Sequence, residues 1–232
     1  MAEYWTDLGI NNYKILQDDE AYAFSQDSVF LANMAKLGSK DAVLDLGCGS
    51  GILSFIALAK KGVKSATGLE ISQKFCDMAT MSANANSLPL EIICGDVKDI
   101  RNLVSAESFD KVLCNPPYFA PSSPISQKAA VARTESTATL DDFVSAASYA
   151  LKFGGDLWIV IKAPRLAALI VSCAKYGLAP KEATLIYPKL SHGVDSVVLS
   201  AKKGGKEGLV LKTFIAQNKD GSFTDEYQSF YR

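Results

Sequence analysis

A short motif near the middle of the chain, Asn115-Pro116-Pro117-Tyr118, combines residues that suit chemistry on a planar amine. The Asn115 side-chain oxygen and the Pro116 carbonyl can each accept a hydrogen bond from an –NH₂ group. Such bonds would pull the nitrogen towards tetrahedral geometry and free its lone pair for attack, while Tyr118 could stack on the ring that carries the amine. A strand that simply ends in a proline turn would contain the same residues. The segments before the motif decide between these two interpretations.

The motif directly follows a short apolar run, Val112 to Cys114, which predicts a buried strand. Pro116 and Pro117 cannot donate to a sheet ladder, and each holds φ near about −65°. Each proline also favours extended geometry in the residue before it. We therefore expect a rigid corner at the end of this strand.

From Asp41 onwards, short apolar segments alternate with amphipathic segments of helical length. This alternation predicts an α/β fold with a Rossmann-like, mostly parallel sheet and helices on both faces. The late segments 184–187 and 196–201 follow each other without a helix, so we expect them to pair antiparallel. Residues 1–24 are rich in aromatic side chains and predict an N-terminal arm that forms an edge hairpin.

Glycines and carboxylates stand at the ends of the predicted strands. Gly47, Gly49 and Gly51 follow the first strand and open a helix, a setting in which the backbone can approach a ligand closely. Asp45 precedes this glycine loop, and Glu70 closes the next strand, where a carboxylate can bind two ribose hydroxyls. Each acid alone would also suit a structural role as a cap or turn former, but their occurrence at successive strand ends favours a nucleotide-like ligand.

The spacing of the loop is Gly-x-Gly-x-Gly, which differs from the Gly-x-Gly-x-x-Gly of nicotinamide dehydrogenases. An antiparallel strand pair is also expected to end the sheet. Both features favour a methyltransferase that binds S-adenosylmethionine. We expect backbone groups of the loop to hold its methionine part and Asp45 to lie near its charged amine. Asp96 closes the third strand of the same half.

Composition sets further bounds on the protein. At 232 residues and 48% hydrophobic content, the chain predicts one compact unit, with an arm and capping helix at 1–38 and the methyltransferase domain at 39–232. The net charge of −1 gives no overall basic field, so RNA binding would need a local patch. Two lysine clusters are candidates for that patch: Lys60, Lys61 and Lys64, and Lys202, Lys203, Lys206 and Lys212.

Cysteine usage and the N-terminus predict a cytoplasmic protein. The five cysteines are scattered without a Cys-x-x-Cys pair, which fits buried thiols in a reducing compartment and predicts no metal site. We expect neither a signal peptide nor a membrane span. The sequence indicates no oligomeric state.

The chain resembles the amino-group methyltransferases with an Asp/Asn-Pro-Pro-Tyr motif. More closely, it is similar to the bacterial tRNA adenine-N6 methyltransferases that act on the adenosine next to the valine tRNA anticodon. One departure is Ala21, where related chains usually have glycine. The closer likeness covers nearly the whole chain and rests on Gln17, 22–28, 115–119, 132–135, 139–142, Gly154-Gly155, 203–205, Gly221, Thr224 and Tyr231.

This resemblance implies roles for particular residues. The target base would be held by Asn115, Pro116, Pro117 and Tyr118. Ser25 and Asp27, in the arm, would close over the methionine end of S-adenosylmethionine. Arg133 and Glu135 would lie near the mouth of the site without a defined role. The remaining cofactor contacts would come from Asp45, Gly47, Gly49, Gly51, Glu70, Ile71, Asp96, Val97 and Asn115.

Similar corners serve three targets in this group: an adenine base, a guanine base of ribosomal RNA (at N2) and the glutamine amide (at N5) of a release factor. The release-factor enzymes usually carry a separate N-terminal helical domain, for which the residues before Asp41 leave little room. A non-catalytic module that binds the cofactor or RNA is a further alternative. The intact Asn115 and Tyr118 argue against such a scaffold, which would not need this corner.

Overall fold

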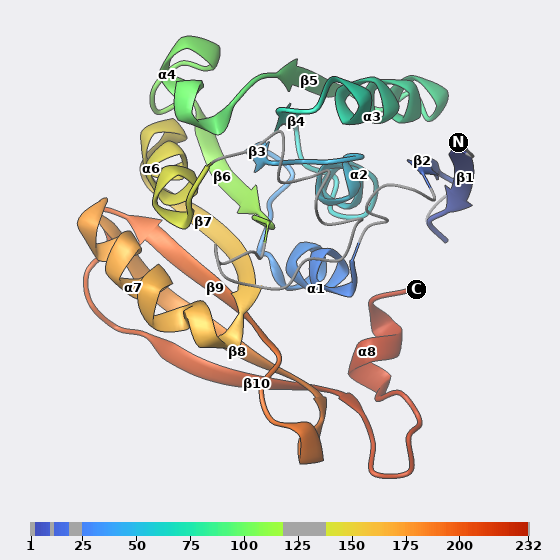
Figure 1. The fold of residues 1–232 in the computed structure, drawn as a ribbon, viewed down its shortest axis with the longest axis vertical. Coiled ribbons are helices and arrows are strands. Elements are labelled where there is room, and N and C mark those ends of the chain that lie inside the picture. Colours follow the sequence, from blue (N-terminus) through green and yellow to red (C-terminus); the bar gives the residue numbers. More distant parts are fainter. Residues whose placement is uncertain (1–2, 10–11, 19–24, 118–137, 232) are drawn as a thin grey trace.

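The computed structural model describes residues 3–9, 12–18, 25–117 and 138–231. An eight-stranded sheet forms its centre, in the order β10-β8-β9-β7-β6-β3-β4-β5 (Figure 1). Its strands are β3 Ala42–Leu46, β4 Ser65–Glu70, β5 Leu90–Cys94, β6 Phe109–Cys114, β7 Leu151–Lys162, β8 Leu178–Lys189, β9 Ser196–Lys203 and β10 Val210–Gln217.

Strand direction in this sheet is mostly parallel. β9 pairs antiparallel with both of its neighbours, β7 and β8, and the other neighbouring pairs run parallel. The expected Rossmann-like sheet with an antiparallel C-terminal pair is therefore confirmed. β10 pairs parallel with β8, so the last strand of the chain runs in the same direction as most of the sheet.

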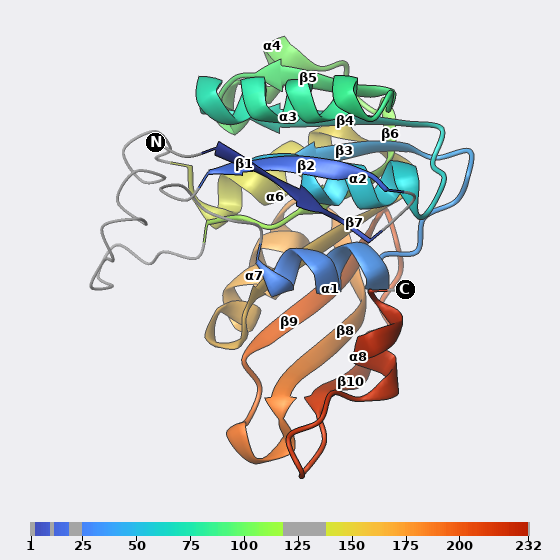
Figure 2. The ribbon, with the colours of Figure 1, turned by 90° about the vertical axis from the view of Figure 1, so that its right-hand side faces the viewer.

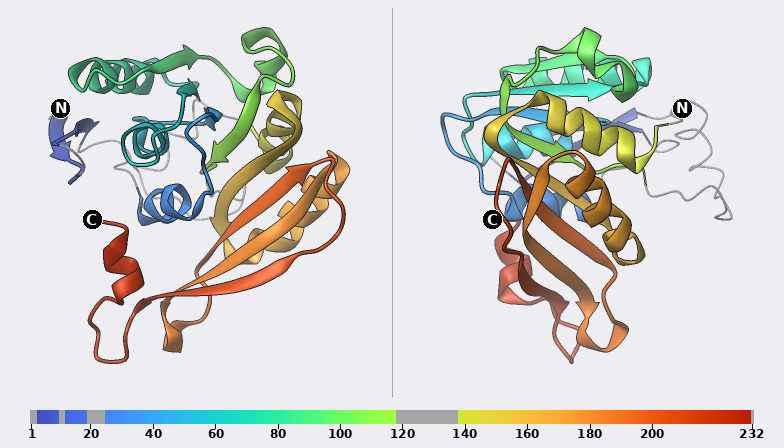
Figure 3. Two further views of the ribbon diagram at one scale, coloured as in Figure 1. Left: turned by 180° about the vertical axis from the view of Figure 1, so that it is seen from behind. Right: turned by 90° about the vertical axis from the view of Figure 1, so that its left-hand side faces the viewer.

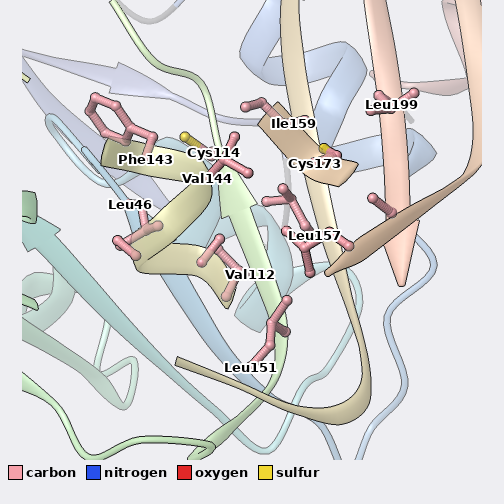
Figure 4. Close-up of a cluster of buried hydrophobic side chains, with 14 of the residues drawn as sticks. Leu46, Val112, Cys114, Phe143, Val144, Leu151, Leu157, Ile159, Cys173 and Leu199 are labelled. Atoms are coloured by element: carbon pink, nitrogen blue, oxygen red, sulfur yellow. The ribbon is translucent and has the colours of Figure 1, made fainter. Parts of the chain in front are cut away.

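Helices cover both faces of the sheet, because side chains along its central strands point alternately into two apolar clusters, one on each face. Leu44 and Val112 point into the cluster under α4, α6 and α7, whereas Val43 and Leu113 point into the cluster under α1 and α2. Figure 4 shows the first cluster, and the right-hand view of Figure 3 shows α6 (yellow) and α7 (orange) covering that face. The helices are α1 Gln26–Met34, α2 Ile52–Ala59, α3 Gln73–Ala85, α4 Ile100–Leu103, α6 Leu140–Ala150, α7 Leu166–Lys175 and α8 Asp225–Ser229, with short 3-10 turns at Val97–Asp99, Ala163–Arg165 and Leu190–His192.

The N-terminal hairpin forms, but it is a separate small sheet instead of an edge of the main one. β1 (Glu3–Asp7) pairs antiparallel with β2 (Lys14–Asp18), and β2 packs on α3. The Leu16 backbone N–H donates to Ser82 Oγ at 2.9 Å, which anchors the hairpin to that helix. Among the described residues, no helix is both long and apolar enough to cross a bilayer.

Candidate active site

The carboxyl ends of β3, β4, β5 and β6 meet at one edge of the sheet. Leu46 at the end of β3 lies beside Leu69 of β4 and Cys114 of β6, and Glu70 lies beside Cys94 of β5. Since these strands are parallel, the residues that follow them emerge on the same side. The structure thus brings Asp45, the glycine loop, Glu70, Asp96 and Asn115 together along this edge, as their sequence positions predict.

Asp45 is fully buried beneath the glycine loop. Its Oδ2 accepts hydrogen bonds from the Ser54 backbone N–H at 3.1 Å and from Ser54 Oγ at 2.9 Å. Its Oδ1 is buried without a hydrogen-bond partner among the described residues. Burial raises the pKa of the Asp45 carboxyl to about 7, and the negative charge of Glu70 adds to that rise. A cation beside Oδ1 would satisfy this oxygen and favour the ionised form, so Asp45 fits the charged amine of S-adenosylmethionine.

The glycine loop adopts a backbone that only glycine takes readily. Gly47, Gly49 and Gly51 have φ of 71°, 54° and 93°. The Gly47 N–H donates to the Leu69 carbonyl at 2.8 Å, which ties the loop to the end of β4. A Cβ at Gly49 would meet no atom within 4 Å, so the backbone here faces open space that a ligand can approach.

Glu70 connects the loop to the helix that follows β4. Its Oε2 accepts from the Gly49 N–H at 2.9 Å and its Oε1 from the Ser72 N–H at 3.0 Å. Ile71 lies between these two anchor points and is half-buried. A carboxylate accepts hydrogen bonds from hydroxyl groups, so the position of Glu70 at the end of β4 suits the two hydroxyls of a ribose.

At the end of β5, Asp96 begins a 3-10 turn (Val97–Asp99). Its Oδ1 accepts from the Lys98 N–H at 2.9 Å, and its Oδ2 lies 3.3 Å from Lys98 Nζ. Val97 is buried, with 6% of its surface exposed. The Gly95 N–H donates to the Glu70 carbonyl at 2.8 Å, which keeps this turn beside Glu70. Both residues therefore lie on the edge where the cofactor is expected.

Asn115 stands at the corner after β6, and its amide is oriented by two serines of α1. Asn115 Nδ2 donates to Ser28 Oγ at 2.7 Å and to Ser25 Oγ at 3.3 Å. Since the donor end of the amide faces α1, Oδ1 is the end suited to hold a substrate amine. Pro116 is buried and Pro117 exposed. Tyr118, Arg133 and Glu135 lie outside the described residues.

Asp27, in the first turn of α1, contacts two residues of the C-terminal half of the sheet, and its expected role at the methionine end stays a prediction. Its Oδ2 lies 3.0 Å from Lys162 Nζ, at the end of β7, and its Oδ1 accepts from Ser196 Oγ at 2.8 Å. Lys162 also pairs with Asp195 at 2.8 Å. Of the two arm residues, the structure brings Ser25 to the Asn115 corner and places Asp27 in this ion-pair network.

The two lysine clusters do not lie beside the site. Lys202 and Lys203 pair with Asp156 and Glu107 at 2.8 and 3.0 Å, near the amino ends of the parallel strands. Lys60 and Lys61, at the end of α2, each donate to a backbone carbonyl, those of Phe230 and Asn33, at 2.9 Å. An RNA-binding patch at one of these clusters stays a prediction.

Sequence reasoning missed three residues that shape the site. A Cβ on Gly68, in the middle of β4, would come within 2.7 Å of Cys48 Sγ, so this glycine makes room for the glycine loop. Ser54 and Ser28 orient Asp45 and Asn115. The spacing of Ser25 and Ser28, three apart at a helix start, places both on one face and is the signal that could have found the second pair.

Comparisons with known proteins agree with this geometry. The model of the methyltransferase small domain family matches residues 23–170. A protein of Shewanella sp. (strain MR-4) named tRNA1(Val) (adenine(37)-N6)-methyltransferase is 31% identical over 208 residues, which cover 87% of each chain. A Methanocaldococcus jannaschii protein, provisionally named a protein N5-glutamine methyltransferase, is 33% identical over 112 residues, or 48% of this chain and 54% of that one.

Among solved structures, a predicted O-methyltransferase of Agrobacterium tumefaciens shares the fold. It has a TM-score of 0.72 at 20% sequence identity and covers 88% of this chain and 95% of its own. The family match includes the strands and loops that carry Asp45, Glu70, Asp96 and Asn115. The chain therefore belongs to the methyltransferase small domain family, among relatives named tRNA1(Val) (adenine(37)-N6)-methyltransferase, and it is an enzyme whose cofactor is S-adenosylmethionine.

Proposed function

We propose that this enzyme methylates the exocyclic N6 amine of an adenosine in a tRNA anticodon loop. Adenosine 37 of valine tRNA, which the names of its relatives specify, is the proposed position. The observation that carries the proposal is the orientation of Asn115, whose amide nitrogen donates to Ser28 and Ser25. That orientation makes Oδ1 an acceptor at the edge where Asp45 and Glu70 would hold the cofactor.

In this reaction S-adenosylmethionine, when bound, supplies an electrophilic methyl group. Asn115 Oδ1 and the Pro116 carbonyl accept the two N–H groups of the adenine amine, which localises its lone pair on nitrogen. Attack of this nitrogen on the methyl carbon would be matched by cleavage of the carbon–sulfur bond, whose electron pair would stay on sulfur. The amine now carries one proton too many, is acidic, and releases that proton to water. The chain thus acts by binding and orienting the amine, and it needs no general base.

A base fits the corner better than a glutamine amide does, because Tyr118 follows Pro117 in the sequence and offers a ring for stacking. An adenosine in a loop is already partly unpaired, so turning it outward costs less than extruding a base from a duplex. A tRNA substrate and five unpaired cysteines also fit a reducing, cytoplasmic setting.

Transfer of labelled methyl groups to RNA tests the proposal. Bulk tRNA lacking the modification is incubated with the protein and labelled S-adenosylmethionine, then digested to nucleosides. We expect the label in N6-methyladenosine, and we expect Asn115→Ala to abolish transfer while cofactor affinity stays within about threefold of wild type. Asn102→Ala, at an exposed position of α4, is the matched control and should transfer normally. Label in guanosine or in a protein glutamine would refute the proposal.

A further inference from the structure

A cavity of about 370 Å³ opens at the carboxyl ends of β7, β8 and β10, beside the Asn115 corner. These strands run parallel to β6, so the cavity lies on the same edge of the sheet as the site described above. Figure 2 shows α1 lying between α2 and α8 in this region. Ser25 joins the two places, because it lines the cavity and its Oγ also accepts from Asn115.

One wall of the cavity is an aromatic platform. The rings of Phe223 and Tyr227 are stacked, with centroids 4.2 Å apart and planes 9° apart. Tyr227 makes an edge-type contact with Phe30, with ring centroids 6.0 Å apart, and its hydroxyl accepts from Gln26 Nε2 at 2.9 Å. Tyr227 is 7% exposed whereas Phe223 is 42% exposed. The platform is therefore anchored through Tyr227 and presents the more exposed ring, Phe223, to a ligand.

The polar lining of the cavity favours a neutral ligand with donor groups. Lys162 stands between Asp27 and Asp195, so two carboxylates face one ammonium and the lining is negative overall. Such a lining repels phosphate but can accept hydrogen bonds from an exocyclic amine, as carboxylates do from bases. The Gln217 side chain also lines the cavity and makes no hydrogen bond to another described residue, so its amide can pair with a base edge.

We propose that this cavity binds a nucleobase of the substrate RNA next to the target adenosine. The inference rests on the proposed function, since it assigns a second subsite for the same RNA. Aromatic platforms stack any base, and the carboxylates and the Gln217 amide add hydrogen-bonding groups at its edge. Because Ser25 belongs to both sites, a base on Phe223 and a target base at Asn115 would belong to adjacent nucleotides.

The cavity does not suit the cofactor. Its lining comes from the start of α1 and from the ends of β7, β8 and β10 with the segments that follow them, and it includes no residue of the glycine loop or of β4. The buried carboxylate with a free oxygen, Asp45, lies beneath the glycine loop instead. A ligand that reaches Phe223 is thus bound by the C-terminal half of the sheet.

A fluorescent base tests the subsite. Anticodon stem-loops carry 2-aminopurine on one side or the other of the target adenosine, and each is titrated with the protein and sinefungin, a cofactor analogue. We expect stacking on Phe223 to quench one of the two probes. Phe223→Ala should abolish that quenching and weaken stem-loop affinity about fivefold or more, whereas Phe223→Tyr should retain both. Phe153→Ala is the matched control, since it also removes an exposed phenylalanine ring, which is 77% exposed. Phe153 lies near the start of β7, whereas the cavity lies at the end of that strand, where Lys162 stands.

Salt dependence separates stacking from phosphate binding. Because a stacked base neutralises no phosphate, Phe223→Ala should lower affinity without changing the slope of log affinity against log salt. Two results would overturn the subsite but leave the proposed function standing, provided that the wild-type protein methylates the RNA. In the first, neither probe is quenched. In the second, Phe223→Ala and Phe153→Ala bind the stem-loop with equal affinity. A smaller salt slope in Phe223→Ala would mean a phosphate contact and would also overturn it. A wild-type protein that methylates no RNA adenosine would refute both.

Discussion

Binding of S-adenosylmethionine should release a proton from Asp45, and this coupling can be measured. The carboxyl is fully buried, Oδ1 has no partner among the described residues, and burial raises its pKa from 3.8 to about 7. If the cofactor's ammonium lies beside Oδ1, the bound state favours the ionised carboxylate. Cofactor binding below about pH 7 then requires that Asp45 lose its proton.

The size of the effect follows from the pKa. With a pKa near 7 in the free protein and a much lower one in the complex, the association constant should rise about 15-fold between about pH 5.5 and pH 7. The cofactor's own amine does not interfere in this window, because α-amino groups titrate at about 7.7–8.0. Calorimetry in buffers of different ionisation enthalpy should show close to one proton released per site at the acidic end.

The stability of the cofactor-free protein should move in the opposite sense. Between about pH 4 and about pH 7 the folded protein holds the Asp45 proton and the unfolded chain has lost it, so stability falls as pH rises. A shift of about three pKa units corresponds to a cost on the order of 4 kcal/mol above pH 7. Other groups also titrate, so the contribution of Asp45 is the difference between wild type and Asp45→Asn.

Two variants test the assignment. Asp45→Asn should bind the cofactor more weakly at pH 7 and should lose the pH dependence, because the amide carries no titrating proton. Asp99→Asn changes an exposed carboxylate three residues beyond Asp96 and should leave the dependence intact. Two results would refute the placement of the ammonium at Asp45. In the first, the affinity of the wild-type protein for the cofactor does not change over this pH range. In the second, the affinity of Asp45→Asn rises with pH as much as that of the wild type.

Three further outcomes follow from the contacts of the site. Glu70→Ala should weaken cofactor binding by about 1.5–3 kcal/mol, since a charged hydrogen-bond acceptor is lost; unchanged affinity in calorimetry would remove Glu70 from the site. Ser28→Ala removes the shorter of the two hydrogen bonds from Asn115 Nδ2 and should lower kcat about two- to tenfold with the KM for cofactor unchanged; equal losses in both constants would point to a folding defect. Charge reversal at Lys202 and Lys203, which are paired at the far edge, should leave RNA affinity unchanged in a filter-binding assay; a loss of affinity would place the RNA there.

Local sequence was enough to predict the elements that carry the chemistry. The apolar run in 42–46 and the prolines after Asn115 act within a few residues, so they predict the strand ends correctly. One boundary depends on packing: α6 ends at Ala150 and β7 begins directly at Leu151, before the two glycines Gly154 and Gly155. Leu151 is fully buried and pairs with Phe109 of β6, and burial of this side chain favours a strand that begins at Leu151.

Tertiary structure alone decided which side chains orient the reacting groups. Asn115 and Ser28 are 87 positions apart, and Asp27 and Lys162 are 135 apart, so no spacing rule links either pair. Parallel strands bring their ends together, and α1 packs against β7 and β9 with its first turn beside Asn115, which joins these distant residues. The sequence by itself determined the fold class, the acids at the strand ends and the corner at Asn115, because each depends on local conformation. The partners of those groups depend on which surfaces the packed helices bury, and only the folded chain specifies that.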